Sequence, residues 1–270
     1  MLDRLVLLVV AVLGLTMPAA LSAEARLASH RAVYVLTLGT AKANGVAAVE
    51  GAMSLDWQET CDGWTMAQRM RFQLFDSDGE SIDNDITFSS WESRDGLSYR
   101  FTMRTLRNGE VADELRGRAT LDGRGKGGKA VFTLPENEIL ELPPGTLFPT
   151  EHTLELIDGA KAGRRTLTRP VFDGASVEGA MEVNAVIAAV AAAEAAVPGA
   201  GKAAELVNGP SWRVRMAFFR MDDQRGSEPE YETTLRVFGN GVGTDFLFDY
   251  QEFSIKARLE RLEMVPPPRC

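Results

Sequence analysis

The stretch that indicates the fold most clearly is Trp212-Arg213-Val214-Arg215-Met216-Ala217-Phe218. Large apolar side chains occupy every second position, and arginines occupy two of the three positions between them. Successive side chains of a β-strand point to opposite faces, so this alternation predicts a strand with one packed face and one wet face. Such two-faced strands are typical of antiparallel sheets.

The same alternation recurs through most of the sequence. We predict further strands over residues 32–38, 46–57, 66–74, 82–90, 99–104, 113–121, 129–134, 166–172, 231–238 and 244–250. Turn-forming pairs, most of them Asp-Gly, separate many of these segments and favour tight reversals of the chain. Many short strands joined by such turns predict a mainly all-β protein whose antiparallel sheet is closed, or nearly closed, on itself.

Few helices are expected. Thr150 follows Pro149 and is predicted to cap a short helix that ends at Gly159 or Gly163. The last long segment, residues 253–264, satisfies both a helical period and a strand period. We predict a strand there because the neighbouring segments are strands.

The alanine-rich tract at about residues 185–204 is ambiguous. Alanine favours a helix, whereas Pro198, Gly199 and Gly201 interrupt the tract and suit a mobile insertion. We predict a partly helical insertion. No linker or internal repeat divides the sequence, so residues 24–270 are predicted to form a single domain.

The N-terminus indicates export. Arg4 precedes an apolar run over residues 5–15, and small residues follow it. This order is typical of a secretory signal peptide, and the run is too short for a membrane span, which needs about 20 residues. Cleavage can follow Ser22, Ala23 or Ala25; we place the signal peptide at residues 1–23. The alternative is an uncleaved apolar anchor. No later stretch has transmembrane length, so the mature protein is expected in the periplasm or outside the cell.

Composition excludes several classes of protein. The chain has 270 residues, 45% apolar and 25% charged, which is enough apolar material for a core and argues against a disordered chain. With 38 acidic against 29 basic residues its net charge is −9, and it lacks the concentrated basic surface that nucleic-acid binding requires. Only 2 His and 2 Cys are present, which is poor raw material for a structural zinc site built from four cysteines or from a cysteine pair plus a histidine pair. We predict no metal and no cofactor.

The two cysteines, Cys61 and Cys270, fit an oxidising compartment. Two cysteines that remain after removal of a signal peptide usually pair there. The alternative is a free, reactive thiol at the C-terminus or a bridge between two chains. Because no Cys-x-x-Cys motif occurs, a redox enzyme is not expected.

Residues for catalysis are scarce. The only histidines are His30 and His152, and a Gly-x-Ser-x-Gly motif is absent because residues 174–178 lack the final glycine. We interpret His152 as a packing or hydrogen-bonding residue in the first turn of the predicted helix. His30 lies in a short polar run before the first predicted strand and is also interpreted as structural. The sequence therefore predicts no catalytic residues.

Two further segments contain residues of the kind that bind ligands. The acidic residues of segment 76–85 could bind calcium, but glycine falls outside the EF-hand register, which favours a solvated hairpin tip. The glycine-rich segment 123–128 joins two predicted strands, and no helix follows it to bind a phosphate, so a flexible hairpin loop is favoured. The apolar faces of the strands are first of all the core, and an additional apolar groove on them stays open.

Several short segments have no common chemical role, but they occur along the chain in a distinctive order. They are His30-Arg-Ala-Val-Tyr34, Cys61-Asp-Gly-Trp64, Trp91-Glu-Ser93 followed by Asp95-Gly96, Leu142-Pro-Pro-Gly-Thr-Leu-Phe-Pro-Thr-Glu-His152, Val171-Phe-Asp-Gly174, Asn240-Gly-Val242, Asp249-Tyr250 and the C-terminal Cys270. Together they cover nearly the whole predicted mature chain.

This series resembles the EipB-like cell envelope integrity family of alphaproteobacterial periplasmic proteins. The resemblance implies a long antiparallel sheet wound into a spiral or open barrel, with one or two helices, similar to lipoprotein-carrier folds. It also implies a disulfide between Cys61 and Cys270 and a role in envelope integrity without an assigned enzymatic activity. The alanine-rich tract matches none of these motifs.

Three functions remain in view. The first is a monomeric, non-enzymatic periplasmic protein that supports the envelope, through envelope proteins or through a lipid, lipoprotein or peptide held in its curved sheet. The second is an outer-membrane barrel, which is disfavoured because 4 Trp and 4 Tyr are too few for two aromatic girdles. The third is a periplasmic hydrolase with an unrecognised site. We favour the first.

Overall fold

Fourteen strands pair into one antiparallel sheet in this computed structural model, which describes residues 26–41, 45–136, 138–191, 196–221 and 228–270. The strands are β1 (His30–Ala41), β2 (Ala48–Glu59), β3 (Gly63–Phe75), β4 (Ser81–Ser93), β5 (Ser98–Arg107), β6 (Glu110–Leu121), β7 (Gly128–Leu134), β8 (Ile139–Leu142), β9 (Thr166–Val171), β10 (Met181–Ala189), β11 (Ser211–Arg220), β12 (Tyr231–Phe238), β13 (Gly243–Asp249) and β14 (Phe253–Met264). The signal peptide predicted at residues 1–23 lies outside the described residues.

The order of the strands places the first and last strands, β1 and β14, side by side at the centre of the sheet. It runs β8-β7-β6-β5-β4-β3-β2-β1-β14-β13-β12-β11-β10-β9, so β1 pairs with β14 and the two edge strands are β8 and β9. No pairing joins β8 to β9 among the described residues, so the sheet is open. The closed alternative is therefore not realised.

The predicted strands are present, and residues 253–264 form β14 as predicted. Two strands were missed. Strand β8 has only four residues, too few for a clear alternation. Strand β10 contains the first part of the alanine-rich tract, where small side chains hide the period of two.

The alanine-rich tract corrects a second prediction. Residues 185–189 belong to β10 and pair with β11, so this part of the tract is not a helical insertion. Its alternate side chains Ala185 and Ile187 are buried, which shows that alanine serves here as a small core residue. Residues 192–195 lie outside the described residues. Helical turns appear later, in the 3₁₀ helix η2 (Gly201–Val207), which packs on β14.

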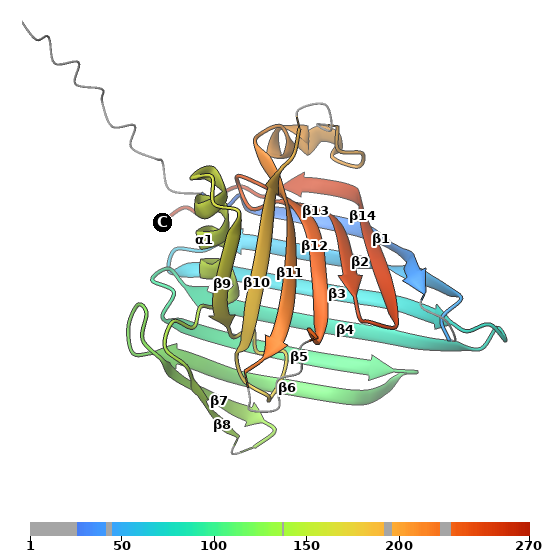
Figure 1. The fold of residues 1–270 in the computed structure, drawn as a ribbon, viewed down its shortest axis with the longest axis horizontal. Helices are drawn as coiled ribbons and strands as arrows, with labels where there is room; N and C mark the ends of the chain where they lie inside the picture. Colours follow the sequence, from blue (N-terminus) through green and yellow to red (C-terminus); the bar gives the residue numbers. More distant parts are fainter. Residues whose placement is uncertain (1–25, 42–44, 137, 192–195, 222–227) are drawn as a thin grey trace, which may run out of the picture.

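The sheet curls so that its two halves face each other. In Figure 1, β9–β12 run crosswise in front of β3–β6, and α1 (Pro149–Lys161) lies beside β9. Three clusters of buried side chains fill the space between the halves. One joins Trp57 and Trp64 of β2 and β3 to Trp212 of β11, and another joins Phe132 of β7 to Phe172, which follows β9. Side chains therefore connect regions that share no backbone pairing.

The alternation of the sequence sorts the residues between the two faces of this curled sheet. On β5, Tyr99 and Phe101 are buried while Arg100 and Arg104 are exposed. Because strands pair residue by residue, exposed side chains of neighbouring strands form continuous polar rows on the outer face. We call this polar surface the outer face and the apolar one the inner face. Within the described part of the chain, no helix has the length and apolar character that crossing a membrane requires.

Candidate functional site

The N-terminus of α1 is closed by a buried carboxylate from the sheet. Glu92 of β4 is 2% exposed and accepts backbone hydrogen bonds from Thr150 at 2.7 Å and Glu151 at 2.9 Å. The first N–H groups of a helix lack partners within it and carry partial positive charge, so a carboxylate there satisfies both needs. The prediction that Thr150 caps the helix is wrong, because Phe148 is the cap residue, with no side-chain cap bond, and Thr150 lies inside the first turn.

The end of the helix is closer to the prediction. The helix runs through Gly159 and ends at Lys161, and Gly163, two residues further on, has φ +79°. Glycine adopts this left-handed conformation at little cost, which ends the helix. Of the two predicted stops, the structure therefore uses Gly163.

The register of the sheet carries Glu92 to the inner face. It stands opposite Trp64 of β3 and Tyr99 of β5, both of which face the core. Close approach of β3 to β4 depends on Gly63, since a Cβ there would lie 2.0 Å from the carbonyl oxygen of Glu92. No side chain fits in that space, so glycine is required beside the residue that caps the helix.

Two opposing effects set the protonation of Glu92. Burial disfavours the charged carboxylate, while the N–H groups of Thr150 and Glu151 favour it. Burial dominates and raises the pKa of Glu92 to about 7, with a smaller contribution in the same direction from the charge of Glu151. The carboxyl group therefore titrates near neutral pH while it holds the helix.

Aromatic rings pack the segment before α1 and the segment after β9 against β5. Phe148 is fully buried and stacks on Tyr99, with 5.0 Å between ring centroids. The hydroxyl of Tyr99 donates to the carbonyl oxygen of Asp173 at 2.9 Å. Gly174 has φ +74°, and a Cβ there would lie 2.3 Å from the ring of Phe101. Three of the segments that mark the family resemblance thus meet at one place.

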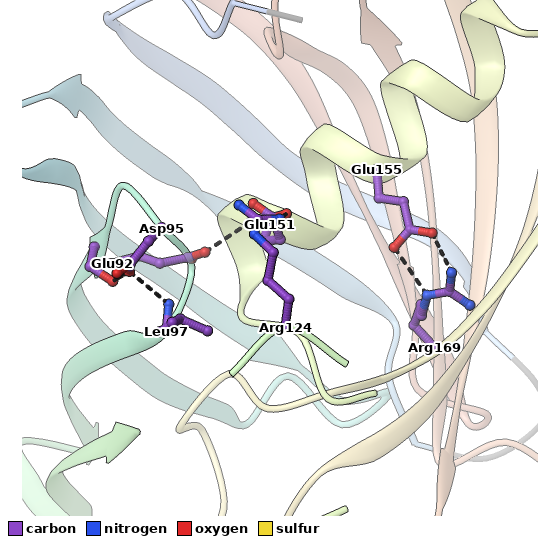
Figure 2. Close-up of polar contacts among 8 residues, drawn as sticks. Glu92, Asp95, Leu97, Arg124, Glu151, Glu155 and Arg169 are labelled. Carbon is purple, nitrogen blue, oxygen red and sulfur yellow. Dashed lines mark hydrogen bonds and ion pairs between the residues drawn. The ribbon is translucent and has the colours of Figure 1, made fainter. Parts of the chain in front are cut away.

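A cleft of about 780 Å³ lies beside α1, between the helix, the β4–β5 turn, the β6–β7 loop and β9. Eight of its 18 lining residues are charged: Arg94, Asp95, Arg124, Glu151, Glu155, Asp158, Arg164 and Arg169. Arg124 from the β6–β7 loop pairs with Glu151 at 2.7 Å, and Arg169 of β9 pairs with Glu155 through two contacts (Figure 2). Four arginines and four acidic residues line the cleft, so its charges balance.

The predicted hairpin at residues 123–128 is present, since it joins β6 to β7. Its Arg124 nevertheless reaches α1, a contact that the sequence did not indicate. The loop therefore forms one wall of the cleft.

The two histidines are buried and have no evident catalytic geometry. His152 is 6% exposed, and burial lowers its pKa to about 4, so the imidazole is neutral at pH 7. Its Nε2 has no hydrogen-bond partner among the described residues. His30 is the first residue of β1, which corrects its placement in a polar run before that strand, and its Nδ1 lies 2.7 Å from the carbonyl oxygen of Ala28. Burial lowers the pKa of His30 as well.

The acidic segment 76–85 forms local contacts. One carboxylate oxygen of Asp76 accepts backbone hydrogen bonds from Asp78 and Glu80, each at 2.9 Å, which closes the β3–β4 turn. Asp85 pairs with Arg69 of β3 at 2.7 Å. Among the described residues, no three His, Cys, Asp or Glu side chains gather as a metal ion would require.

The structure joins Cys61 to Cys270 by a disulfide, with 5.7 Å between the Cα atoms. Cys61 lies in the turn between β2 and β3, and Cys270 ends the tail that follows β14. Since β1 alone separates β2 from β14 in the sheet, the bridge spans the centre of the sheet and not its edges.

Glu92 was not predicted as a functional residue, although the sequence contains a signal for its burial. Residues Ile86, Phe88 and Ser90 share its phase in β4, so a carboxylate follows on the apolar side of an alternating strand. A buried carboxylate needs hydrogen-bond donors, and an unsatisfied helix start supplies them. Which helix would supply them depends on the tertiary fold, which the sequence pattern alone does not provide.

These features define a class: an open, curled antiparallel β-sheet protein with an α-helix capped from within the sheet. The chain belongs to the EipB-like family, whose sequence model matches residues 21–266. It is 30% identical over 256 residues to the cell envelope integrity protein EipB of Brucella abortus (strain 2308), covering 93% of this chain and 89% of that protein.

The fold is also similar to a solved structure. A crystal structure of a β-barrel-like protein of a domain of unknown function from Brucella abortus matches with a TM-score of 0.79 and 28% sequence identity. The match covers 90% of this chain and 100% of that chain. The mainly antiparallel, open fold expected from the resemblance is therefore confirmed.

Proposed function

We propose that this chain is an exported, non-enzymatic protein that supports the integrity of the cell envelope from the periplasm. The observation that carries the proposal is its 30% identity to a protein named for that role, over 93% of the chain. The apolar run at residues 5–15 supports export. Burial of both histidines and of Glu92 supports a structural use of these groups in place of acid–base catalysis.

We propose further that the protein acts as a monomer by binding another component of the envelope. The candidate ligands are a lipid, a lipoprotein or a peptide. The cleft beside α1 supports a peptide, because its balanced charges suit side chains and backbone groups and not an acyl chain. Arg124 and Arg164 stand at this cleft with well-exposed side chains, 69% and 56%, where a bound peptide can reach them.

A deletion strain complemented with variants tests this function. Loss of the protein should sensitise cells to detergents and to cell-wall antibiotics, and the wild-type chain should restore resistance. Arg124→Glu with Arg164→Glu should fail to restore it. The matched control, Lys256→Glu with Arg258→Glu, changes the same charge at exposed positions of β14 and should restore resistance.

Each result has a defined meaning. Equal complementation by both double variants would argue against a role for the cleft. A deletion strain without any envelope defect would contradict the envelope function itself. Recovery of the protein from the cytoplasm with Met1 still present would contradict export. Failure of His152→Gln to complement, despite normal folding and abundance, would favour the hydrolase alternative.

A further inference from the structure

A cluster of arginines without acidic partners lies on the outer face, away from the cleft beside α1. Arg100 of β5 and Arg118 of β6 stand directly opposite each other, and Arg116 stands opposite Thr102. All three arginines are exposed. We call them the arginine cluster. They line a shallow hollow of about 500 Å³ together with Ser89, Trp91, Thr102 and Thr133.

Their surroundings differ from those of other arginines on the same sheet. Arg31 pairs with Asp56 at 2.8 Å and Arg69 pairs with Asp85 at 2.7 Å. In the part of the chain that the structure describes, no carboxylate lies within 4.0 Å of a member of the arginine cluster. Asp62 is a nearby acid, and its carboxylate already accepts hydrogen bonds from Thr60 at 2.9 Å and from Trp91 at 3.4 Å. Asp62 also interacts electrostatically with Arg100, so the three positive charges of the cluster are only partly matched.

The arrangement costs stability. Like charges that face each other across two antiparallel strands repel, because their Cβ atoms are only about 5 Å apart. Arg100 is held in place by the ring of Trp91, with 4.2 Å between the guanidinium carbon and the ring centroid, so it is not free to turn away. The repulsion between Arg100 and Arg118 does not stabilise the fold, although the chain as a whole has a net charge of −9. Binding of an anion explains why two positive charges are held together here.

The chemistry of the hollow selects the anion. A phosphomonoester has three terminal oxygens and close to two negative charges, and guanidinium groups bind such oxygens through paired hydrogen bonds. Three arginines more than balance this charge, and the hydroxyl groups of Ser89 and Thr102 provide further donors, whereas the hydroxyl of Thr133 already donates to the carbonyl oxygen of Arg116 at 3.3 Å. A phosphodiester has one charge and two free oxygens, so it makes fewer of these contacts.

We propose that the arginine cluster binds the phosphomonoester head group of a membrane lipid. The hollow is shallow and its arginines are exposed, so a bound phosphate keeps one side open, where the ester arm leads to the rest of the lipid. The net charge of −9 repels the protein from an anionic membrane surface. Binding to a membrane would therefore depend on recognition of an individual phosphate group and not on general attraction to a charged surface.

Vesicle flotation tests this proposal with the full mature protein. The probes are phosphatidylcholine vesicles that contain either phosphatidic acid, a monoester, or phosphatidylglycerol, a diester, at equal total charge. The wild-type protein should bind the phosphatidic acid vesicles at least about tenfold more tightly. Arg100→Gln with Arg118→Gln should reduce that binding at least about tenfold. The control, Lys256→Gln with Arg258→Gln, removes the same charge from exposed residues of β14 and should retain it.

Thermal unfolding of the same variants separates binding from folding. Arg118→Gln should melt at the same temperature as the wild type or higher, because it removes the repulsion from Arg100. A lower melting temperature would assign the arginines a structural role and overturn the proposal. Equal binding to both vesicles, equal loss in both double variants, or no binding by the wild type would also overturn it. So would binding of inorganic phosphate as tight as that of the lipid, since free phosphate would then be the ligand.

Discussion

Glu92 is the residue whose environment matters most for the fold around α1. Its pKa rises from 4.5 to about 7 on folding, so between these values the folded protein holds a proton that the unfolded chain has lost. The stability that Glu92 contributes is therefore fully present below pH 4.5 and is lost as the pH rises through about 7. Glu92 remains at the start of the helix in both protonation states. Burial of its charged form, however, costs free energy and so lowers the stability of the folded protein.

The first prediction uses Glu92→Gln, which removes this titration and keeps one acceptor for the helix N–H groups. Relative to the variant, the wild type should lose up to about 3 kcal/mol of unfolding free energy as the pH rises from about 4.5 to above 7. Urea denaturation of both proteins across this range measures the difference. A wild type that gains stability over the variant with rising pH would show that the helix N–H groups outweigh burial.

His152 has the opposite dependence on pH. Burial lowers its pKa from 6.5 to about 4, so below pH 6.5 the unfolded chain binds a proton that the folded protein excludes. The stability that it contributes is fully present above pH 6.5 and is lost as the pH falls toward about 4. Between these values the two residues act in opposite directions, and their effects on the stability of the wild type partly cancel.

The second prediction follows from the unpartnered Nε2 of His152. His152→Leu replaces a buried polar ring with an apolar side chain, so at pH 7 it should change stability by less than about 1 kcal/mol. Its unfolding free energy should fall less on acidification to pH 5 than that of the wild type. Denaturation at the two pH values checks this, and a variant as sensitive to acid as the wild type would rule out His152 as the source.

Individual strands were largely predictable, since each carries its own alternation and is bounded by turn residues. The exceptions have physical reasons. In β10 the core-facing positions include alanine, so composition indicated a helix where pairing with β9 and β11 imposes a strand. The cap of α1 was predicted two residues too late, at Thr150, because the carboxylate that closes the helix start comes from Glu92, more than fifty residues away in the sequence. Such partners are set by tertiary contacts.

The third prediction concerns the approach of β3 to β4. Gly63→Ala should destabilise the protein by about 2 kcal/mol or more, because its Cβ would meet the backbone of Glu92 at 2.0 Å and force the strands apart. Gly209→Ala is the matched control, since nothing lies within 4 Å of its added Cβ. Thermal unfolding compares the two. Equal melting temperatures would mean that the strands adjust without cost.

The sequence did not show what holds the two halves of the curled sheet together. The sequence predicted that Cys61 and Cys270 pair, but not where the bridge lies in the sheet. The structure shows that the turn after β2 and the tail after β14 are near neighbours at the centre of the sheet. The two halves are held by buried side chains such as Phe172, which contacts the rings of Phe101 and Phe132.

The last prediction separates these two sources of stability. Cross-linking residues 209 positions apart removes up to about 5 kcal/mol of unfolded-chain entropy, but a compact reduced chain would lower the gain. Cys61→Ser, Cys270→Ser and the double variant should lower the melting temperature to similar extents, because the bridge is one unit. Hydrogen exchange should then increase mainly in the tail after β14, where the backbone bond from Val265 to Ser29 is an anchor that remains.

Phe172→Ala provides the contrast to loss of the bridge. Removing a fully buried ring should cost about 3–5 kcal/mol and should increase exchange in both halves of the sheet, because that ring joins them. If cysteine replacement instead exposed both halves while Phe172→Ala acted only locally, the disulfide and not the core would hold the sheet in its curled form. Disulfide-linked dimers on non-reducing gels would contradict an intramolecular bridge altogether.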